Sequence, residues 1–423
     1  MKASKLMLVL ALASAGVVRA SVNVMDVKVQ PRSPWTGLVD VEYTVVCEDA
    51  DSDIYVNPVG YDGDRRITLF PSSFTGDGAE GPVKPGKHTM VWDAKKDFGH
   101  LFSCANFQLK IHAGKRLPRY AVIDLSEGAS ATNYPVHFSV IGPNLSNDVC
   151  RTTELWLRLV PPGEFWMGSP TDELGRTNNE DLHHVTLTKP FYIGVFEVTQ
   201  KQYELVMGEK CGYFSSSENA DVRPVEKIAW SGRIRGNVSP TSTTIDPNSF
   251  CGRVRARSGL AQLDLPSETR WEYACRAGTM TALYNGRNLI SKVADEGLSR
   301  IAGYEANCHN NRDYNGSSVL VGTRKVGSFE PNALGLYDML GNVWEWCLDS
   351  AYGFNYNAHL GNQDVVDPVV SSYNWNYSDS AFWNHGGSWR NEAWELRAAR
   401  RNAFRYGVSN DDVGFRVCSE IGF

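Results

Sequence analysis

Helix signals are scarce in residues 155–423, and this scarcity limits the fold more than any other feature of the chain. One short helix is expected to begin with a capping box, in which the Thr199 hydroxyl accepts from the Gln202 amide while the Gln202 side chain reaches back, and to end at Gly208. A second helix is expected to end at Gly278. The rest is interrupted by Gly, Asn and Pro. Much of the region must therefore be irregular backbone, which needs bound ions, aromatic packing or disulfides to stay ordered.

The N-terminal part of the chain has a different pattern. Residues 22–112 alternate between apolar and polar positions, as half-buried strands do. The clearest stretch has its apolar residues at Val39, Val41, Tyr43 and Val45. We expect an all-β sandwich over residues 21–115, similar in pattern to the immunoglobulin-like modules of exported proteins. The periodicity weakens in residues 116–154, which we expect to form a linker to a second domain over residues 155–423.

The first twenty residues have the pattern of a secretory signal peptide. Lys2 and Lys5 precede an apolar run at 6–18, and small residues surround an expected cleavage site near Ala20. The run is shorter than the roughly 20 residues that a membrane span needs. We therefore expect a secreted or periplasmic protein with no membrane span.

The net charge bears on the expected partners, and the cysteine content bears on the expected disulfides. The formal net charge is −6, and loss of the signal peptide would remove further positive charge, so we expect no nucleic-acid partner. The nine cysteines are an odd number, and an oxidising compartment permits disulfides without assuring them. Cys47 and Cys104 lie in two candidate strands of the sandwich. They form either a disulfide between sheets or two separate thiols packed as small hydrophobic groups.

Five blocks of the second domain carry a family resemblance. They lie at residues 162–169, 191–199, 265–279, 332–346 and 386–389. In this order and spacing they resemble the formylglycine-generating enzyme, or sulfatase-modifying factor, family. The resemblance implies a helix-poor, irregular α+β fold, a compact variant of the C-type-lectin-like architecture.

One of these blocks contains a candidate calcium site. Asp338 and Glu345 offer hard carboxylate oxygens on either side of a glycine-containing turn, whose carbonyl groups can face the same point, and calcium prefers such ligands. The resemblance implies a site made by Asp338, the carbonyl groups of Gly341 and Val343, and Glu345. The alternative is structural, with Asp338 capping a turn and Glu345 paired with a buried arginine.

The cysteine pair of the active family members is missing. In those relatives a serine of Gly-Gly-Ser is followed three residues later by one cysteine and five residues after that by another, and together they bind copper(I) and activate oxygen to convert a substrate cysteine to formylglycine. Ser388 matches the serine, but Asn391 and Leu396 occupy the cysteine positions, unless the second position is deleted. Copper(I) needs soft thiolate ligands, so we expect neither copper nor a catalytic residue here.

Two further pairs of residues have structural alternatives. By resemblance Cys275 matches a cysteine that commonly bridges to one near the C-terminus, which implies a Cys275–Cys418 disulfide. Cys418 lies one residue beyond the family position, and the alternative is two free thiols in the core. Adjacent residues on a strand point to opposite faces, so His183 and His184 are expected to be structural rather than a metal pair.

Residues near the missing cysteine pair are expected to line a binding groove. These residues are Ser388, Trp389, Asn391, Trp394 and Arg397. Arginine would pair with carboxylates and tryptophan would stack on sugar or peptide faces, but Arg397 could instead brace the core through buried ion pairs. The first functional hypothesis is a calcium-stabilised module that binds a peptide or glycan and has lost oxidase activity. The alternative is a formylglycine-generating oxidase, or a related enzyme, that uses other ligands.

Overall fold

The computed structural model describes most of the chain. The described residues are 22–99, 104–115, 117–238, 242, 244–308, 311–312, 318–319, 322–351, 364–369 and 381–420. The expected signal peptide of residues 1–20 lies outside them. Within the described residues, no helix has the length and apolar character that crossing a membrane requires.

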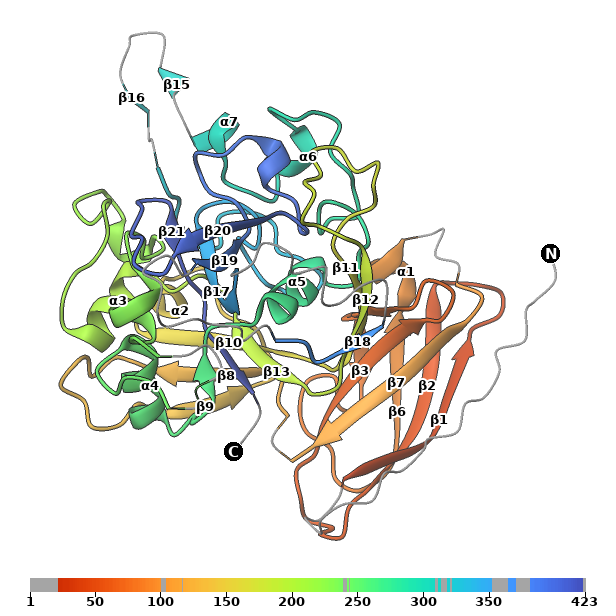
Figure 1. Ribbon diagram of the computed structural model, residues 1–423. Coiled ribbons are helices and arrows are strands. Elements are labelled where there is room, and N and C mark those ends of the chain that lie inside the picture. Colours follow the sequence, from red (N-terminus) through yellow and green to blue (C-terminus); the bar gives the residue numbers. More distant parts are fainter. Residues whose placement is uncertain are drawn as a thin grey trace. The chain divides into compact units, whose positions relative to one another are not determined.

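The chain divides into two compact units. The first contains residues up to 120 together with 138–142, and the second contains residues 121–137 and 143 onward (Figure 1). The segment 116–154, expected as a linker, is largely structured. It contains β8 (Tyr120–Asp124), β9 (Val136–Ser139), α2 (Val149–Thr152) and the first residue of β10 (Glu154–Val160).

The first unit is the predicted β-sandwich. One sheet has the order β1 (Asn23–Pro31), β2 (Leu38–Val46), β6 (Gly86–Asp93) and β5 (Phe74–Gly76). The other has the order β4 (Ile67–Leu69), β3 (Tyr55–Asp62) and β7 (Phe107–Gly114), and α1 (Ala94–Phe98) follows β6. The alternation is confirmed, because the four apolar residues from Val39 to Val45 on β2 are at most 3% exposed. Trp92 of β6 stacks on Phe107 of β7, with ring centroids 5.3 Å apart, which joins the two sheets.

The possible Cys47–Cys104 disulfide does not form, and the alternative of two separate thiols holds. The strand register separates the two cysteines. Trp92 pairs with Val39 on β2 and stacks on Phe107, so Cys104 lies near the Val39 end of that strand. Cys47 is eight residues farther along, roughly 26 Å at the rise of a β-strand. The Cys104 thiol instead lies beside Asp62, and burial followed by this carboxylate raises the pKa of Cys104 to about 11.

The second unit contains several separate sheets. The one with the most strands has the order β14 (Leu263–Asp264), β22 (Cys418–Glu420), β13 (Phe191–Gly194), β10, β8 and β9. A second has the order β20 (Arg401–Arg405), β19 (Ala381–His385), β17 (Trp344–Ser350) and β21 (Val413–Gly414). The smaller sheets pair β11 (Gly163–Met167) with β12 (His183–Leu187) and β18 (Val365–Val366), and β15 (Asn311–Arg312) with β16 (Ser318–Val319).

The helices of the second unit are short, as expected. They are α3 (Gln200–Met207), α4 (Phe250–Ser258), α5 (Glu268–Arg276), α6 (Glu296–Ser299), α7 (Glu305–Cys308) and the single-turn elements η1 (Ala220–Val222), η2 (Trp230–Ile234) and η3 (Ala393–Glu395). The capping box of α3 is confirmed, and Gly208 ends that helix in the left-handed conformation. Helix α4, whose N-cap is Ser249, was not expected from the sequence. A Cβ at position 252 would lie only 2.0 Å from the carbonyl oxygen of Asp246, so this helix position requires Gly252.

The Cys275–Cys418 disulfide that the family resemblance implied does not form either, and the alternative of free core thiols holds. Cys275 on α5 places its Sγ 3.9 Å from the carbonyl oxygen of Met339. Cys418 on β22 pairs with Asp264 and lies beside Arg270 instead. Large buried aromatic side chains, including Trp271, Trp344, Trp346 and Trp383, therefore stabilise the irregular backbone without disulfides.

Candidate functional site

A two-glycine turn positions the serine that matches the family motif. Gly386 and Gly387 follow β19 and both have positive φ, 96° and 75°. A Cβ on Gly387 would lie 2.8 Å from the side chain of Leu396, so only glycine fits there. The turn buries Ser388 completely.

The side chains around Ser388 form a closed hydrogen-bond network. The Ser388 hydroxyl lies 2.6 Å from Oδ1 of Asn391 and 3.2 Å from Oδ2 of Asp412. The amide of Asn391 also donates to Glu395 at 2.8 Å, so the residue at the first cysteine position has all its polar groups engaged. Burial raises the pKa of Asp412 despite the opposing effect of Arg390. This network holds the loop 388–395, and none of these side chains offers the sulfur ligand that copper(I) prefers.

The second cysteine position is apolar core. Leu396 is fully buried and packs against Gly387. One cysteine does pack near this region, because Cys308 forms a buried cluster with Phe214 and Trp389. Its Sγ lies 3.3 Å from Nε of Arg324, and burial raises the pKa of its thiol. A single protonated thiol does not replace the pair that copper(I) requires.

Arg397 lies in the core and forms buried ion pairs there, which is the structural alternative given for this residue. Its guanidinium binds Glu180 at 2.7 and 2.8 Å and Glu173 at 2.7 Å, and it also donates to the carbonyl of Gly175 at 2.7 Å. Burial raises the pKa of Glu180, but Arg397 outweighs it and the net direction is downward. Arg397 therefore holds the backbone of the loop 171–180.

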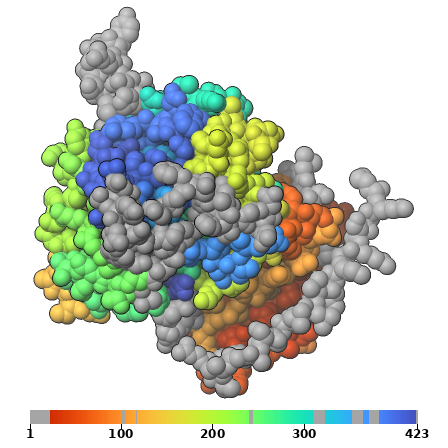
Figure 2. Space-filling model, viewed as in Figure 1, coloured from red at the N-terminus to blue at the C-terminus, as the bar shows by residue number. Residues whose placement is uncertain are grey.

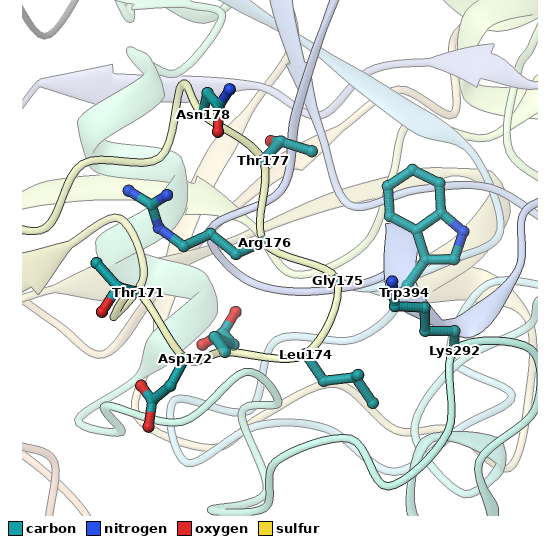
Figure 3. Close-up of a pocket in the computed structure, with 10 residues that line it drawn as sticks. Thr171, Asp172, Leu174, Gly175, Arg176, Thr177, Asn178, Lys292 and Trp394 are labelled. Carbon is teal, nitrogen blue, oxygen red and sulfur yellow. The ribbon is translucent and has the colours of Figure 1, made fainter.

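This loop forms one wall of an open pocket of 580 Å³. The pocket is lined by residues 171–178 together with Lys292 and Trp394. In Figure 3, Trp394 and Lys292 lie on one side of the loop and the side chain of Arg176 extends toward the other. Figure 2 shows the yellow-green surface of the loop bordering the blue surface of the C-terminal part. Besides the loop, the pocket is lined by the segments that contain Lys292 and Trp394. Backbone hydrogen bonds from Ala393 and Trp394 to the carbonyl groups of residues 293 and 292 join these two segments.

The five expected groove residues do not line one common groove. Ser388, Trp389 and Arg397 are buried, and only Asn391 and Trp394 are partly exposed. Of the five, Trp394 alone lines the pocket. The loop 171–178 was not expected to line a site, although its Gly, Thr, Asp and Asn residues are typical of a surface loop.

The expected calcium ligands lie among buried charges. Both carboxylate oxygens of Glu345 bind Arg416 at 2.6 Å, and one also accepts from Nε1 of Trp271 at 2.6 Å. Oδ2 of Asp338 accepts from the amide of Gly327 at 2.6 Å. Each side chain therefore has the partner that the structural alternative named, an arginine for Glu345 and a turn amide for Asp338.

A third carboxylate, missed in the sequence, completes this cluster. Glu197 accepts from the Asn342 side chain at 2.6 Å and from the Val343 amide at 3.2 Å. Burial, followed by the charges of Asp338 and Glu345, raises the pKa of Glu197. Burial also raises the pKa of Asp338 to about 6. Three carboxyl groups thus face the one guanidinium of Arg416, and the raised pKa values mean that protonation offsets part of this excess; a bound cation would offset it in another way.

The fit of these residues to calcium is therefore partial. Oδ1 of Asp338 is buried and has no hydrogen-bond partner, as a cation ligand would in the absence of its ion. The oxygens of Glu345 are already engaged, and the part of the chain that is described contains no group of three or more His, Cys, Asp or Glu side chains arranged to hold a metal. Asp338 and main-chain carbonyls are thus the ligands this arrangement could offer.

The two adjacent histidines face different partners. Nδ1 of His183 lies 2.8 Å from the carbonyl oxygen of Asp181. His184 lies between the carboxylates of Glu164 and Asp364, at 3.3 and 3.6 Å. They contribute to packing around β11, β12 and β18, as expected for residues on opposite faces of a strand.

The helix-poor second unit and the two-glycine turn define a protein of the sulfatase-modifying-factor class. Residues 145–421 match the family model described as the sulfatase-modifying factor enzyme 1-like domain. The match covers more than half of the chain, and the chain belongs to this family.

Three relatives are similar to parts of the chain. The chaperone protein LppX of Paenibacillus barcinonensis is 34% identical over 191 residues, which cover 39% of this chain and 63% of LppX. The formylglycine-generating enzyme of Bos taurus is 24% identical over 295 residues, covering 62% of this chain and 74% of that protein. The inactive C-alpha-formylglycine-generating enzyme 2 of Bos taurus is 25% identical over 303 residues, covering 62% and 87%. The chain thus spans less than two thirds of the length of LppX.

Proposed function

We propose that this protein is an exported binding module, stabilised by calcium, that recognises a peptide or glycan and lacks formylglycine-generating oxidase activity. The observation that carries the proposal is the content of the two family cysteine positions. Asn391 there is hydrogen-bonded to Ser388 and Glu395, and Leu396 is buried against Gly387. Neither side chain offers the sulfur ligand that copper(I) needs to activate oxygen.

The relatives support a non-oxidase role alongside the oxidase alternative. Among the proteins similar to this chain, one is named as a chaperone and another as inactive, which supports a role without this chemistry. Others are named as formylglycine-generating enzymes, which supports the alternative. The open pocket beside Trp394 supplies a surface for binding that does not depend on the missing thiols.

Calcium belongs to the proposal because of the buried carboxylate cluster. The partnerless Oδ1 of Asp338 and the excess of carboxylates over Arg416 favour a cation with oxygen ligands at that point. Asp338 and the carbonyl groups of Gly341 and Val343 would hold it. Glu345 would contribute only if it partly released Arg416.

The test of the proposal is an oxidase assay on the full chain. The protein is incubated with copper, oxygen and a cysteine-containing sulfatase-motif peptide, and the peptide is followed by mass spectrometry. We expect no aldehyde above the copper-only background, while a formylglycine-generating enzyme assayed in parallel forms it. Turnover by this chain would establish the oxidase alternative. Export is tested separately by sequencing the N-terminus of secreted protein, which we expect to begin after Ala20.

A further inference from the structure

We infer that the pocket between the loop 171–178 and Trp394 binds a neutral saccharide. The inference rests on the proposed function, since it specifies the ligand of a binding module. The pocket volume of 580 Å³ falls in the range of about 300–1,000 Å³ that is typical of small-ligand sites. Its lining combines a tryptophan with many short polar side chains.

The loop that forms the pocket is held in place from behind. The Arg397 guanidinium binds both the Gly175 carbonyl and the carboxylate of Glu173, so the middle of the loop is fixed to the core. Gly175 has a φ of 87°, and a Cβ there would lie 2.7 Å from the Cβ of Trp394. Glu180 fixes the end of the loop through Thr177 at 2.7 Å. A pocket that is ordered before binding loses less conformational entropy when a ligand enters.

The indole of Trp394 is held by polar neighbours. Its Nε1 donates to Glu392 at 3.2 Å, and the guanidinium of Arg400 lies 5.2 Å from the ring centroid. These contacts orient a large, rigid apolar surface on the pocket wall. Tryptophan combines such a surface with a low entropic cost of immobilisation, and the C–H face of a sugar ring offers a matching apolar surface.

The charges that line the pocket argue for a neutral ligand. The Glu173 carboxylate is buried and binds Arg397 at 2.7 Å, so it does not face the open pocket, and Arg176 is paired with Asp181 at 3.0 Å. Asp172 and Lys292 remain, they have opposite signs, and neither forms an ion pair within the described residues. An anionic ligand would be attracted by Lys292 and repelled by Asp172, and a cationic ligand would meet the reverse.

The remaining lining groups suit hydroxyl groups. Thr171 offers a donor and an acceptor, Asn178 offers both types on one amide, and Asp172 accepts while Lys292 donates. Every sugar hydroxyl both donates and accepts, so a saccharide can satisfy this mixed set. An apolar ligand would leave these groups without partners.

The experiment measures binding of the full chain to an array of neutral and acidic oligosaccharides and to a peptide library, followed by calorimetry with the tetrasaccharide that binds best. We expect a neutral oligosaccharide to bind, with a Kd that changes less than about twofold between 50 and 500 mM salt, because no net charge is neutralised. Trp394→Ala should weaken binding at least tenfold. Asp172→Asn should weaken it about fivefold, the effect of one exposed hydrogen bond.

Lys210→Gln is the matched control, because Lys210 is exposed and lies outside the pocket lining, and it should bind as the unchanged chain does. If Trp394→Ala is poorly folded by circular dichroism, Asp172→Asn and Thr171→Val carry the test, since both positions are exposed. Absence of binding to every saccharide, or binding that these variants leave unchanged, overturns the inference. If only peptides bind, this inference is wrong while the proposed binding function stands; aldehyde formation in the oxidase assay would instead remove the proposed function.

Discussion

Arg397 and Glu180 form a buried, bidentate ion pair, with nitrogen–oxygen distances of 2.7 and 2.8 Å. The pair joins the segment after the two-glycine turn to the loop 171–180, and Glu173 adds a third charged contact at 2.7 Å. A buried charge that loses its partner is costly because water cannot replace the contact. The arrangement explains why Arg397 has a structural role rather than the ligand-binding role that was the alternative.

Arg397→Met should therefore destabilise the protein strongly. We expect a loss of about 3–5 kcal/mol in the free energy of unfolding, because Glu173 and Glu180 would be left buried without their guanidinium. Urea denaturation followed by tryptophan fluorescence measures the change. The triple variant with Glu173→Gln and Glu180→Gln should recover part of the loss.

Arg300→Met is the control for this prediction, because Arg300 pairs with Glu330 on the exposed surface. Its denaturation midpoint should stay within experimental error of the unchanged chain. Equal effects of Arg397→Met and Arg300→Met would mean that the buried network contributes nothing beyond a surface ion pair.

Asn391→Ala should also lower stability. The side chain accepts from the Ser388 amide and hydroxyl and donates to Glu395, and its removal leaves buried polar groups without partners. We expect a cost of about 1–3 kcal/mol in urea denaturation. Asn410→Ala, at an exposed position, should change little. A neutral effect at Asn391 would argue that this residue is kept for ligand contact rather than for holding the loop.

Glu226 should make stability depend on pH. It is fully buried and accepts from the amides of Tyr213 and Phe214, and burial raises its pKa from 4.5 to about 6. A raised folded-state pKa means that its stabilising contribution is complete below pH 4.5 and is lost as pH rises through 6.

The pH effect is measured as the difference in unfolding free energy between the unchanged chain and Glu226→Gln. As pH falls from 7 to 4.5 this difference should shift by about 2 kcal/mol in favour of the unchanged chain, because one pKa unit corresponds to 1.36 kcal/mol. Glu330→Gln, at an exposed position, should show no comparable shift. A shift in the opposite direction would contradict the assigned rise in pKa.

Calcium should raise the thermal midpoint of the protein, and chelation should lower it. A ligand that binds only the folded state at about 100 times its Kd adds about 2.7 kcal/mol. Asp338→Ala should lose this calcium response, because Oδ1 of Asp338 is the partnerless oxygen of the cluster. Differential scanning calorimetry with and without calcium measures the response.

Asp181→Asn is the control for the calcium measurement, since Asp181 is an exposed carboxylate outside the cluster. It should keep the full calcium response. A response of equal size in Asp338→Ala would place any calcium elsewhere, and no response in the unchanged chain would leave the cluster as a purely structural network.

Local patterns in the sequence predicted the elements that depend on local forces. The alternation from Val39 to Val45 predicted a buried strand face, and the Thr199–Gln202 capping box predicted the start of α3. Helix α4 was missed because its Gly252 weakens the helical signal, and only the nearby Asp246 carbonyl explains that glycine. For both cysteine pairs the sequence left a disulfide and two free thiols open, and the structure decided for free thiols, because tertiary positions rather than local patterns determine whether two thiols meet.

The sequence by itself determined the family, the helix-poor architecture and the replacement of the family cysteine pair by Asn391 and Leu396, because these depend on residue identity and order. Only the tertiary structure decided which polar residues are buried and which line the pocket. Arg397 and Trp394 are three residues apart, yet one pairs with Glu173 and Glu180 in the core and the other faces the open pocket. Their environments come from the loop 171–180, more than two hundred residues earlier in the chain, and no local pattern encodes that contact.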